Sequence, residues 1–198
     1  MKPLVLASTS PYRRKLMDQL AVPYVAAAPE EEEDHQLELP TEEFVQELAR
    51  RKALSLAAKF PEALIIGADQ VAEIDGERLF KPMTPARAKA QLRRLAGRTH
   101  RLVTGLVVHE PETGRTEAAL DVQRMTLRSL SEEAIAAYVE ADAPVDCAGA
   151  YKVEGAGIAL FASMRGDDFT GIIGLPLTKV VDLLERFGVD VLTARSSA

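Results

Sequence analysis

Residues 4–14 read LVLASTSPYRR, a short apolar run followed by a polar turn and a proline. The run from Leu4 to Ala7 predicts a buried strand. Ser10 suits the N-cap of a helix and Pro11 suits its first position, so we expect a helix from Pro11 to about Leu20. A strand that passes into a helix through so short a turn is typical of α/β proteins.

The same alternation continues along the chain. We expect a helix over Thr41 to Phe60, then an apolar strand, Leu64 to Ile66, that ends in Gly67-Ala68-Asp69-Gln70, and a hairpin over Val71 to Leu79 that turns at Asp75-Gly76. Further elements are expected as a helix from Thr84 to Gly97, strands over His100 to His109, Ala118 to Arg128 and Ile158 to Phe161, and helices after Ser131 and Pro176. Hairpins and crossovers together predict an α/β fold with a mixed, twisted sheet flanked by helices, in a single domain of residues 1–198.

Composition excludes several classes of protein. The chain has 198 residues, of which 47% are apolar, and its 30 acidic and 24 basic side chains give a net charge of −6, which disfavours a nucleic acid polymer or an anionic membrane as partner. One cysteine, Cys147, excludes an internal disulfide framework. Apolar runs stay far below the roughly 20 residues of a membrane span, and the stretch near residue 4 is too short for a signal peptide. We therefore expect a cytoplasmic protein.

The first candidate site is the turn that contains Ser8, Ser10 and Arg13. A helix N-terminus offers unpaired N–H groups, so hydroxyls and a guanidinium beside it can bind phosphate. In the competing interpretation, Ser10 only caps the helix and Arg13 lies on a solvated face.

Two further candidates carry opposite charges. Phe44, Leu48 and Lys52 follow one another at four-residue steps, so Lys52 stands where the stripe predicts an apolar residue. It either extends past the edge of the core or points into a cleft. Asp69 follows a predicted strand, where a carboxylate can act as a base or a metal ligand, or can simply form a turn.

Weaker candidates complete the set. The acidic run Glu30 to Asp34 suits a solvated loop, although one of its carboxylates could join Asp69 around Mg²⁺ or Mn²⁺. Lys81 precedes Pro82, which restricts its backbone to extended forms. The histidines lack metal-ligand spacing and Cys147 lacks a histidine partner, so we interpret all four as structural or surface residues. Taken together, the cations and carboxylates favour metal-assisted attack of water on a phosphoanhydride.

Residues 6–14 also resemble the Ser-x-Ser-x-x-Arg signature of the Maf family. Later blocks match that family in order, so the resemblance covers nearly the whole chain; they are Gly67 to Val71, Lys81-Pro82, Gly97, Thr104-Gly105, Ala148 to Tyr151, Glu154-Gly155 and Gly174 to Leu177.

The resemblance implies a cytoplasmic nucleoside triphosphate pyrophosphatase that uses a divalent metal and releases a monophosphate and pyrophosphate. It implies two lobes with a central cleft, a fold similar to inosine triphosphate pyrophosphatases, and often a homodimer. Asp69 would be the proton acceptor and would bind metal with Glu33, although the run departs from the family pattern and leaves the choice among Glu30 to Glu33 open. The triphosphate would be held by Ser8, Ser10, Arg13, Lys52 and Lys81.

Three positions bear on the substrate. Tyr12, Gln70 and Glu154 resemble the branch that acts on 7-methyl-GTP, whereas the other branch, acting on dTTP and UTP, usually has Arg and Thr in place of the first two. N7-methylation makes the base cationic, so an aromatic face and a nearby carboxylate would favour it. The alternatives are a dTTP/UTP pyrophosphatase and, from another class, a nucleotide-binding regulator of septum formation.

Overall fold

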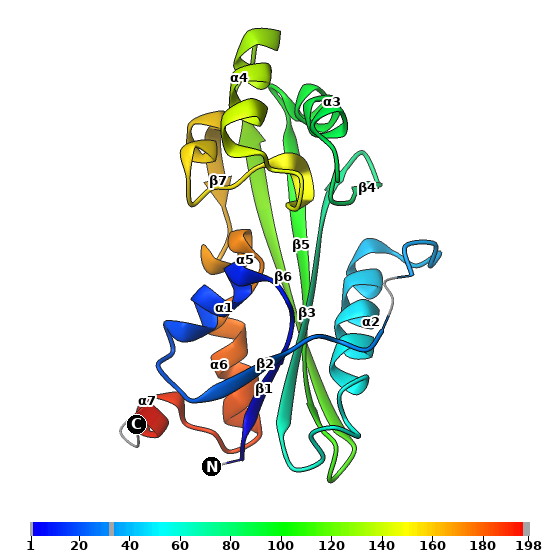
Figure 1. The fold of residues 1–198 in the computed structure, drawn as a ribbon, viewed down its shortest axis with the longest axis vertical. Coiled ribbons are helices and arrows are strands. Elements are labelled where there is room, and N and C mark those ends of the chain that lie inside the picture. The colour runs from blue at the N-terminus through cyan, green and yellow to red at the C-terminus, as the bar shows by residue number, and fades with distance from the viewer. Residues whose placement is uncertain (1, 32–33, 196–198) are drawn as a thin grey trace. The chain divides into compact units, whose positions relative to one another are not determined.

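Helices and strands alternate along the computed structural model, which describes residues 2–31 and 34–195 (Figure 1). In chain order the elements are β1 (Leu4–Ala7), α1 (Pro11–Asp18), β2 (Tyr24–Ala27), α2 (Thr41–Leu54), β3 (Leu64–Ile74), β4 (Glu77–Leu79), α3 (Pro85–Leu95), β5 (Thr99–Glu110), β6 (Arg115–Leu127), α4 (Glu132–Asp142), the 3₁₀ helices η1 (Ala148–Ala150) and η2 (Ala156–Leu160), β7 (Phe161–Arg165), α5 (Thr170–Ile173), α6 (Leu177–Arg186) and α7 (Val191–Ala194).

The strands form one mixed sheet in the order β2-β1-β3-β5-β6-β7, with β4 paired to β3 off this path. β1 runs parallel to both β2 and β3, whereas β4 and β7 pair antiparallel with β3 and β6. The predicted mixed α/β sheet flanked by helices is therefore confirmed. The chain divides into two compact units: unit 1 comprises Met1–Asp69, Thr104–Asp121 and Asp168–Ala198, and unit 2 comprises Gln70–Val103 and Val122–Asp167. The cleft implied by the resemblance stays a prediction.

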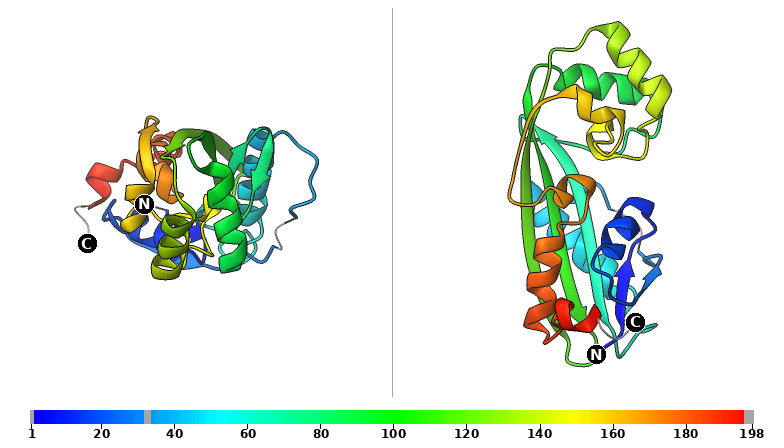
Figure 2. Two further views of the ribbon diagram at one scale, coloured as in Figure 1. Left: turned by 90° about the horizontal axis from the view of Figure 1, so that it is seen from above. Right: turned by 90° about the vertical axis from the view of Figure 1, so that its left-hand side faces the viewer.

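Unit 1 has helices on both faces of its sheet (Figure 1). Because side chains alternate along a strand, Leu4 and Leu6 of β1 pack with α1 and α6, while Val5 and Ala7 pack with α2 on the opposite face. The short strand is thus buried on both faces, as its continuous apolar sequence predicts. At the end of the unit, α7 packs against α6 (Figure 2).

Two glycines let α2 approach the sheet closely. A Cβ atom on Gly67 of β3 would lie 2.1 Å from the backbone oxygen of Ala49, and one on Gly105 of β5 would lie 2.4 Å from backbone atoms of Val45. Neither position could carry a side chain without displacing the helix, since real Cβ contacts are much longer. These contacts fix the distance between α2 and the sheet.

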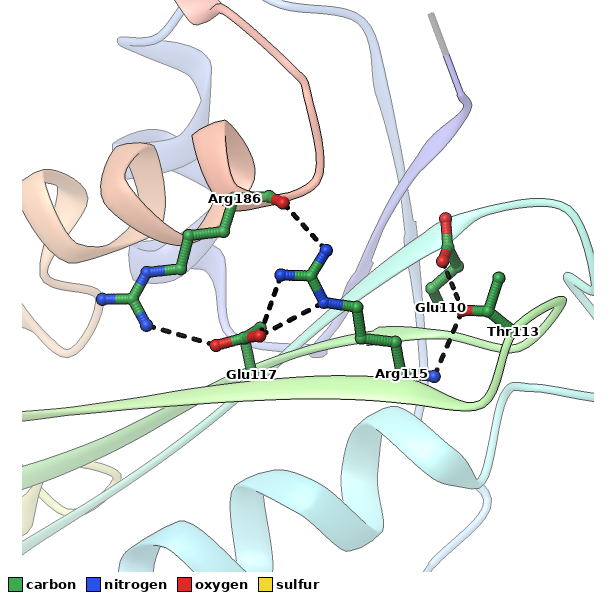
Figure 3. Close-up of polar contacts among 5 residues, drawn as sticks. All are labelled: Glu110, Thr113, Arg115, Glu117 and Arg186. Carbon is green, nitrogen blue, oxygen red and sulfur yellow. Dashed lines mark hydrogen bonds and ion pairs between the residues drawn. The ribbon is translucent and has the colours of Figure 1, made fainter.

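The C-terminal end of α6 is tied to the sheet by a charged network (Figure 3). Arg115 of β6 donates to the carbonyl oxygen of Arg186, the last residue of α6, at 3.0 Å, and pairs with Glu117 at 2.9 Å. Glu117 also pairs with Arg186 at 3.2 Å, and the Arg115 guanidinium lies 4.5 Å from the ring centroid of Phe187. A cation at a helix C-terminus interacts favourably with the negative end of the helix dipole, so this network stabilises the end of α6. The chain leaves the helix at Gly188, which has a φ of 76°, and the N–H of Val189 donates to the carbonyl oxygen of Leu184 at 3.0 Å.

Unit 2 is built around α3 and α4, which pack against each other (Figure 2). Thr84 and Ser131 cap these helices, each accepting a hydrogen bond from the backbone N–H three residues later. The β3–β4 hairpin turns at Asp75 and Gly76, both with positive φ, as the Asp-Gly pair predicts. Among the helices of the described residues, none has the length and apolar character needed to cross a membrane.

Three predicted boundaries are wrong. The helix expected to reach Phe60 ends at Leu54, because the hydroxyl of Ser55 donates to the carbonyl oxygen of Lys52 and the chain continues in turns. β3 does not end before Asp69 but continues to Ile74, since pairing with β4 takes over beyond the end of β1. The strand expected over Ile158 to Phe161 is mostly the 3₁₀ helix η2, and β7 follows it.

Candidate active site

The turn between β1 and α1 is held by its own serines. The Ser8 hydroxyl accepts a hydrogen bond from the backbone N–H of Ser10 at 3.1 Å, and the Ser10 hydroxyl accepts one from the N–H of Arg13 at 3.4 Å. Ser8 is buried, and Ser10 is the N-cap of α1. The capping interpretation of Ser10 is therefore confirmed, and it fixes the positive end of the helix dipole at this turn.

Arg13 does not lie on a solvated face. The side chain is half-buried, and its Nε donates a hydrogen bond of 2.8 Å to the carbonyl oxygen of Gly174. Gly174 has a φ of 116°, a conformation that L side chains rarely adopt. The contact joins residues 161 positions apart and orients the guanidinium from outside its own helix.

Lys52 and Asp69 form a buried ion pair. The Nζ atom of Lys52 lies 2.5 Å from Oδ1 of Asp69, and the two residues are 7% and 6% exposed. Lys52 therefore points inward rather than extending past the edge of the core. Buried charges persist only when they are paired, so each side chain holds the other in place.

The register of the parallel strands explains why these residues gather. Ala7 of β1 is paired with Ala27 of β2 on one side and with Gly67 of β3 on the other. Ser8 and Asp69 thus come one and two residues after the end of this pairing. Although Asp69 lies inside β3, it occupies the position beyond the carboxyl end of β1, where α/β proteins bind ligands. The close approach of α2 at Gly67 brings Lys52 to the same place.

The start of the acidic run is anchored near Lys52. The backbone N–H of Glu30 donates to the hydroxyl of Ser55 at 3.0 Å, and Glu31 lies 3.8 Å from Arg51. Glu33, the predicted metal ligand of this run, lies outside the described residues.

The residues that the structure describes offer few side-chain ligands for a metal ion, but these ligands suit a hard cation. Within residues 2–31 and 34–195, no three Asp, Glu, His or Cys side chains gather as a metal cluster. Asp69 still supplies a buried carboxylate oxygen donor. A magnesium ion is commonly bound through one or two carboxylates, with water and substrate phosphates as its other ligands, so the residues present fit such an ion.

Of the remaining predicted site residues, Tyr12 is half-buried in the first turn of α1 in unit 1, and the other three belong to unit 2. Gln70 follows Asp69 in β3 and is half-buried, whereas Lys81 and Glu154 are exposed. The loop that carries Lys81 is fixed on both sides: Phe80 accepts a hydrogen bond of 2.8 Å from the Gln91 side chain, and the N–H of Met83 donates to Val145 at 2.9 Å.

Buried aromatic residues anchor the segment before Glu154. The Tyr138 hydroxyl accepts a hydrogen bond of 2.9 Å from the N–H of Lys152, and burial raises the pKa of this tyrosine. Nε2 of His100 lies 2.7 Å from the Tyr151 hydroxyl, and burial lowers the pKa of His100 to about 4. Burial also raises the pKa of Cys147 to about 12. Burial thus disfavours the charged forms of both His100 and Cys147, which fits the interpretation that neither is a catalytic residue.

In unit 1, Ser8, Ser10 and Arg13 thus follow β1 directly, and the Lys52–Asp69 pair lies just beyond the register that joins β1 to β3. Such cations, hydroxyls and a carboxylate can bind an anionic group and activate a water molecule beside it. Sequence reasoning missed the carbonyl of Gly174 and the buried Asp168 that precedes it. The Asp-x-Thr pattern at residues 168–170 is the signal that could have revealed a built turn there.

Comparison with known proteins gives consistent matches. A family model described as "Maf-like protein" matches residues 3–187. A protein of Syntrophotalea carbinolica named 7-methyl-GTP pyrophosphatase is 49% identical over 193 residues, 97% of this chain and 98% of that protein. A protein of Pseudomonas aeruginosa with the same name is 44% identical over 96% of this chain and its own full length. Among solved structures, a HAM1 protein from Coxiella burnetii matches with a TM-score of 0.43 and 16% identity, over 64% of this chain and 73% of that one.

Proposed function

The chain belongs to the Maf family, and from that premise we propose that it is a nucleoside triphosphate pyrophosphatase that acts on 7-methyl-GTP. It hydrolyses the bond between the α- and β-phosphates and releases a nucleoside monophosphate and pyrophosphate. The observation that carries the proposal is the buried pair of Lys52 and Asp69 beyond the carboxyl end of β1. The names of relatives 41–49% identical over nearly their full length support the substrate.

Cationic side chains and the N-terminus of α1 bind the phosphate groups. Arg13 and Lys52 bind phosphate oxygens, and Ser8 and Ser10 hold the turn whose helix N-terminus favours an anion. By resemblance, Lys81 contributes a further cation. Cations favour this reaction because negative charge builds up on the leaving pyrophosphate as the anhydride bond breaks.

Asp69 acts as the proton acceptor. As the oxygen of water forms its bond to phosphorus, the anhydride P–O bond breaks, pyrophosphate leaves, and the proton of the water passes to the Asp69 carboxylate. The ion pair with Lys52 fixes the carboxylate for this step.

We propose that a divalent cation, Mg²⁺ or Mn²⁺, is required and that Asp69 binds it together with a carboxylate of the acidic run, Glu33 by resemblance. When bound, the cation neutralises phosphate charge and lowers the pKa of a water ligand. The anchoring of Glu30 on Ser55, three residues from Lys52, supports a contribution from this run.

Tyr12, Gln70 and Glu154 select the base. Tyr12 lies in the first turn of α1, next to Arg13, and by resemblance its ring stacks on the purine. The positive charge of a 7-methylated base adds a cation–π contribution of roughly 0.5–2 kcal/mol over plain GTP. The Glu154 carboxylate contributes in the same direction by charge.

We further propose that residues 1–198 act as one functional domain in the cytoplasm, on free nucleotides rather than on nucleic acid polymers. A homodimer is the assembly implied by the resemblance. Light scattering coupled to size exclusion, with and without nucleotide, tests the assembly directly.

A nucleotide panel tests the function. With Mg²⁺ or Mn²⁺ present, 7-methyl-GTP should be turned over faster than GTP, dTTP and UTP, with pyrophosphate released. Asp69→Asn should lower kcat by about 10²–10⁴-fold, whereas Asp182→Asn, at an exposed position on α6, should not. Hydrolysis of UTP without that of 7-methyl-GTP would show the pyrimidine branch to be correct. Tight binding with no turnover, and a division phenotype that survives Asp69→Asn, would favour the regulator.

A further inference from the structure

Asp168 is a buried carboxylate with an unusually complete set of partners. Oδ1 accepts hydrogen bonds from the N–H of Thr170 at 2.8 Å and from its hydroxyl at 2.5 Å. Oδ2 accepts from the N–H of Thr178 at 2.7 Å and from its hydroxyl at 2.8 Å. Burial opposes ionisation, but these four hydrogen bonds outweigh it and hold the pKa of Asp168 below its usual value.

These contacts replace a missing helix cap. α6 begins after Pro176, which has no side chain able to accept a hydrogen bond from the first turn. The N–H of Leu177 donates instead to the Thr170 hydroxyl at 2.8 Å, and the next N–H donates to Asp168. Asp168 and Thr170 thus cap α6 from ten and seven residues upstream, and the carboxylate lies at the positive end of the helix.

The cap closes the segment between α5 and α6 into a fixed loop, and that loop contains Gly174. The backbone N–H of Gly174 donates to the carbonyl oxygen of Thr170 at 3.2 Å. The carbonyl oxygen of Gly174 accepts the hydrogen bond from Nε of Arg13. Thr170 therefore connects the cap to Gly174, because its side chain bonds to Asp168 and its carbonyl oxygen accepts from Gly174.

We propose that Asp168 is a positioning residue of the active site, which fixes the Gly174 carbonyl and thereby orients Arg13 toward the triphosphate. The inference rests on the proposed role of Arg13 in phosphate binding. It assigns to the segment 168–178 a function in substrate binding beyond the folding of α6. Misplacing a phosphate-binding guanidinium by about 1 Å costs on the order of 10²-fold in rate.

The test compares Asp168→Asn with a matched control. Asp190→Asn removes an exposed carboxylate that caps α7 by accepting from two backbone N–H groups at 2.9 and 3.4 Å, so it tests the loss of a helix cap elsewhere in unit 1. Assayed well below the melting temperature of each variant, Asp168→Asn should lower kcat/KM for 7-methyl-GTP by about 10–10²-fold. Asp190→Asn should leave kcat/KM unchanged. Thr178→Val should cause a smaller loss, and Thr178→Ser, which keeps the hydroxyl, should restore activity.

A double-mutant cycle shows whether the effect passes through Arg13. In the Arg13→Ala background, Asp168→Asn should cause little further loss of kcat/KM. As a single variant, Asp168→Asn should divide its effect between kcat and KM in the same ratio as Arg13→Ala does. Additive losses, or full activity of Asp168→Asn, would overturn the inference.

The Arg13 Nε–H signal in a nitrogen–proton NMR spectrum gives a readout that needs no substrate. Its exchange with water should be slow in the wild-type chain and faster in Asp168→Asn. If the wild-type chain hydrolyses no nucleotide, the proposed function fails. The affinity for a non-hydrolysable α,β-methylene triphosphate then decides the inference. If Asp168→Asn weakens binding in the wild-type chain but not in the Arg13→Ala background, the inference is supported. If Asp168→Asn leaves the affinity unchanged, or if the wild-type chain does not bind, the inference is overturned.

Discussion

Replacing Lys52 with methionine removes one charge of a buried ion pair and keeps an unbranched side chain. Nζ and Oδ1 of Asp69 are 2.5 Å apart, and the two side chains are only 8% and 9% exposed. The variant leaves the Asp69 carboxylate buried without its cation, and breaking a buried pair in this way costs about 3–5 kcal/mol. We expect the free energy of unfolding to fall by that amount, and kcat/KM to fall by on the order of 10²–10³-fold because a phosphate contact is also lost.

Urea unfolding followed by circular dichroism measures the first effect, since the chain has no tryptophan to report by fluorescence. Arg93→Met is the matched control, because Arg93 and Glu132 pair at a similar distance, 2.6 Å, but are 49% and 62% exposed. The free energy of unfolding of Arg93→Met should fall by less than about 1 kcal/mol.

The double variant Lys52→Met/Asp69→Asn separates charge from packing. With no charge left to bury, it should recover about half or more of the stability lost in Lys52→Met. If Lys52→Met unfolds within about 1 kcal/mol of the wild-type chain, the pair is not desolvated and the argument from burial fails.

Three further outcomes follow from the structure. Gly67→Ala should lower the free energy of unfolding in urea by about 1–3 kcal/mol, because its Cβ would meet a backbone oxygen at 2.1 Å. Gly155→Ala provides the contrast, because the nearest atom to its Cβ would lie at an ordinary contact distance of 3.7 Å. His100 stays neutral in the folded protein down to pH about 4 but takes a proton near pH 6.5 when unfolded, so stability should fall by about 3 kcal/mol as the pH drops between these values. His100→Gln should reduce the dependence of the unfolding free energy on pH, measured by urea unfolding at several pH values in this range. An unchanged pH dependence would contradict the lowered pKa of His100. Cys147, with a pKa of about 12, should react with iodoacetamide at pH 8 on the order of 10³-fold more slowly in the native chain than in urea; equal rates would refute it.

Local patterns predicted most elements and failed where a distant partner decides the outcome. Ser10-Pro11, Thr84-Pro85 and Asp75-Gly76 specify their caps and turn within four residues, and each appears as expected. The predicted hairpin with β4 forms, but its first strand is continuous with Leu64 to Ile66 as β3, and no pattern inside residues 64–69 reveals that continuity. The helix ending at Leu54 stops where the Ser55 hydroxyl bonds to Lys52 and Glu30.

The candidate site divides in the same way. Lys52 stood out because a charge occupied an apolar stripe, and Asp69 because a carboxylate followed an apolar strand. Arg13 belonged to a recognisable motif. Asp168 did not stand out, since its four hydrogen bonds come from threonines whose positions depend on how α5 leads into α6.

The sequence by itself determined the α/β class, the helix caps and the turn types, and it predicted candidate phosphate-binding residues, because each depends on neighbours within one or two turns of the chain. Only the tertiary structure decided which of those residues meet. The Lys52–Asp69 pair spans 17 positions and the contact from Arg13 to Gly174 spans 161. Both depend on how closely α2 and the segment before α6 pack against the sheet, and that distance is set by glycines and buried hydrogen bonds rather than by any local periodicity.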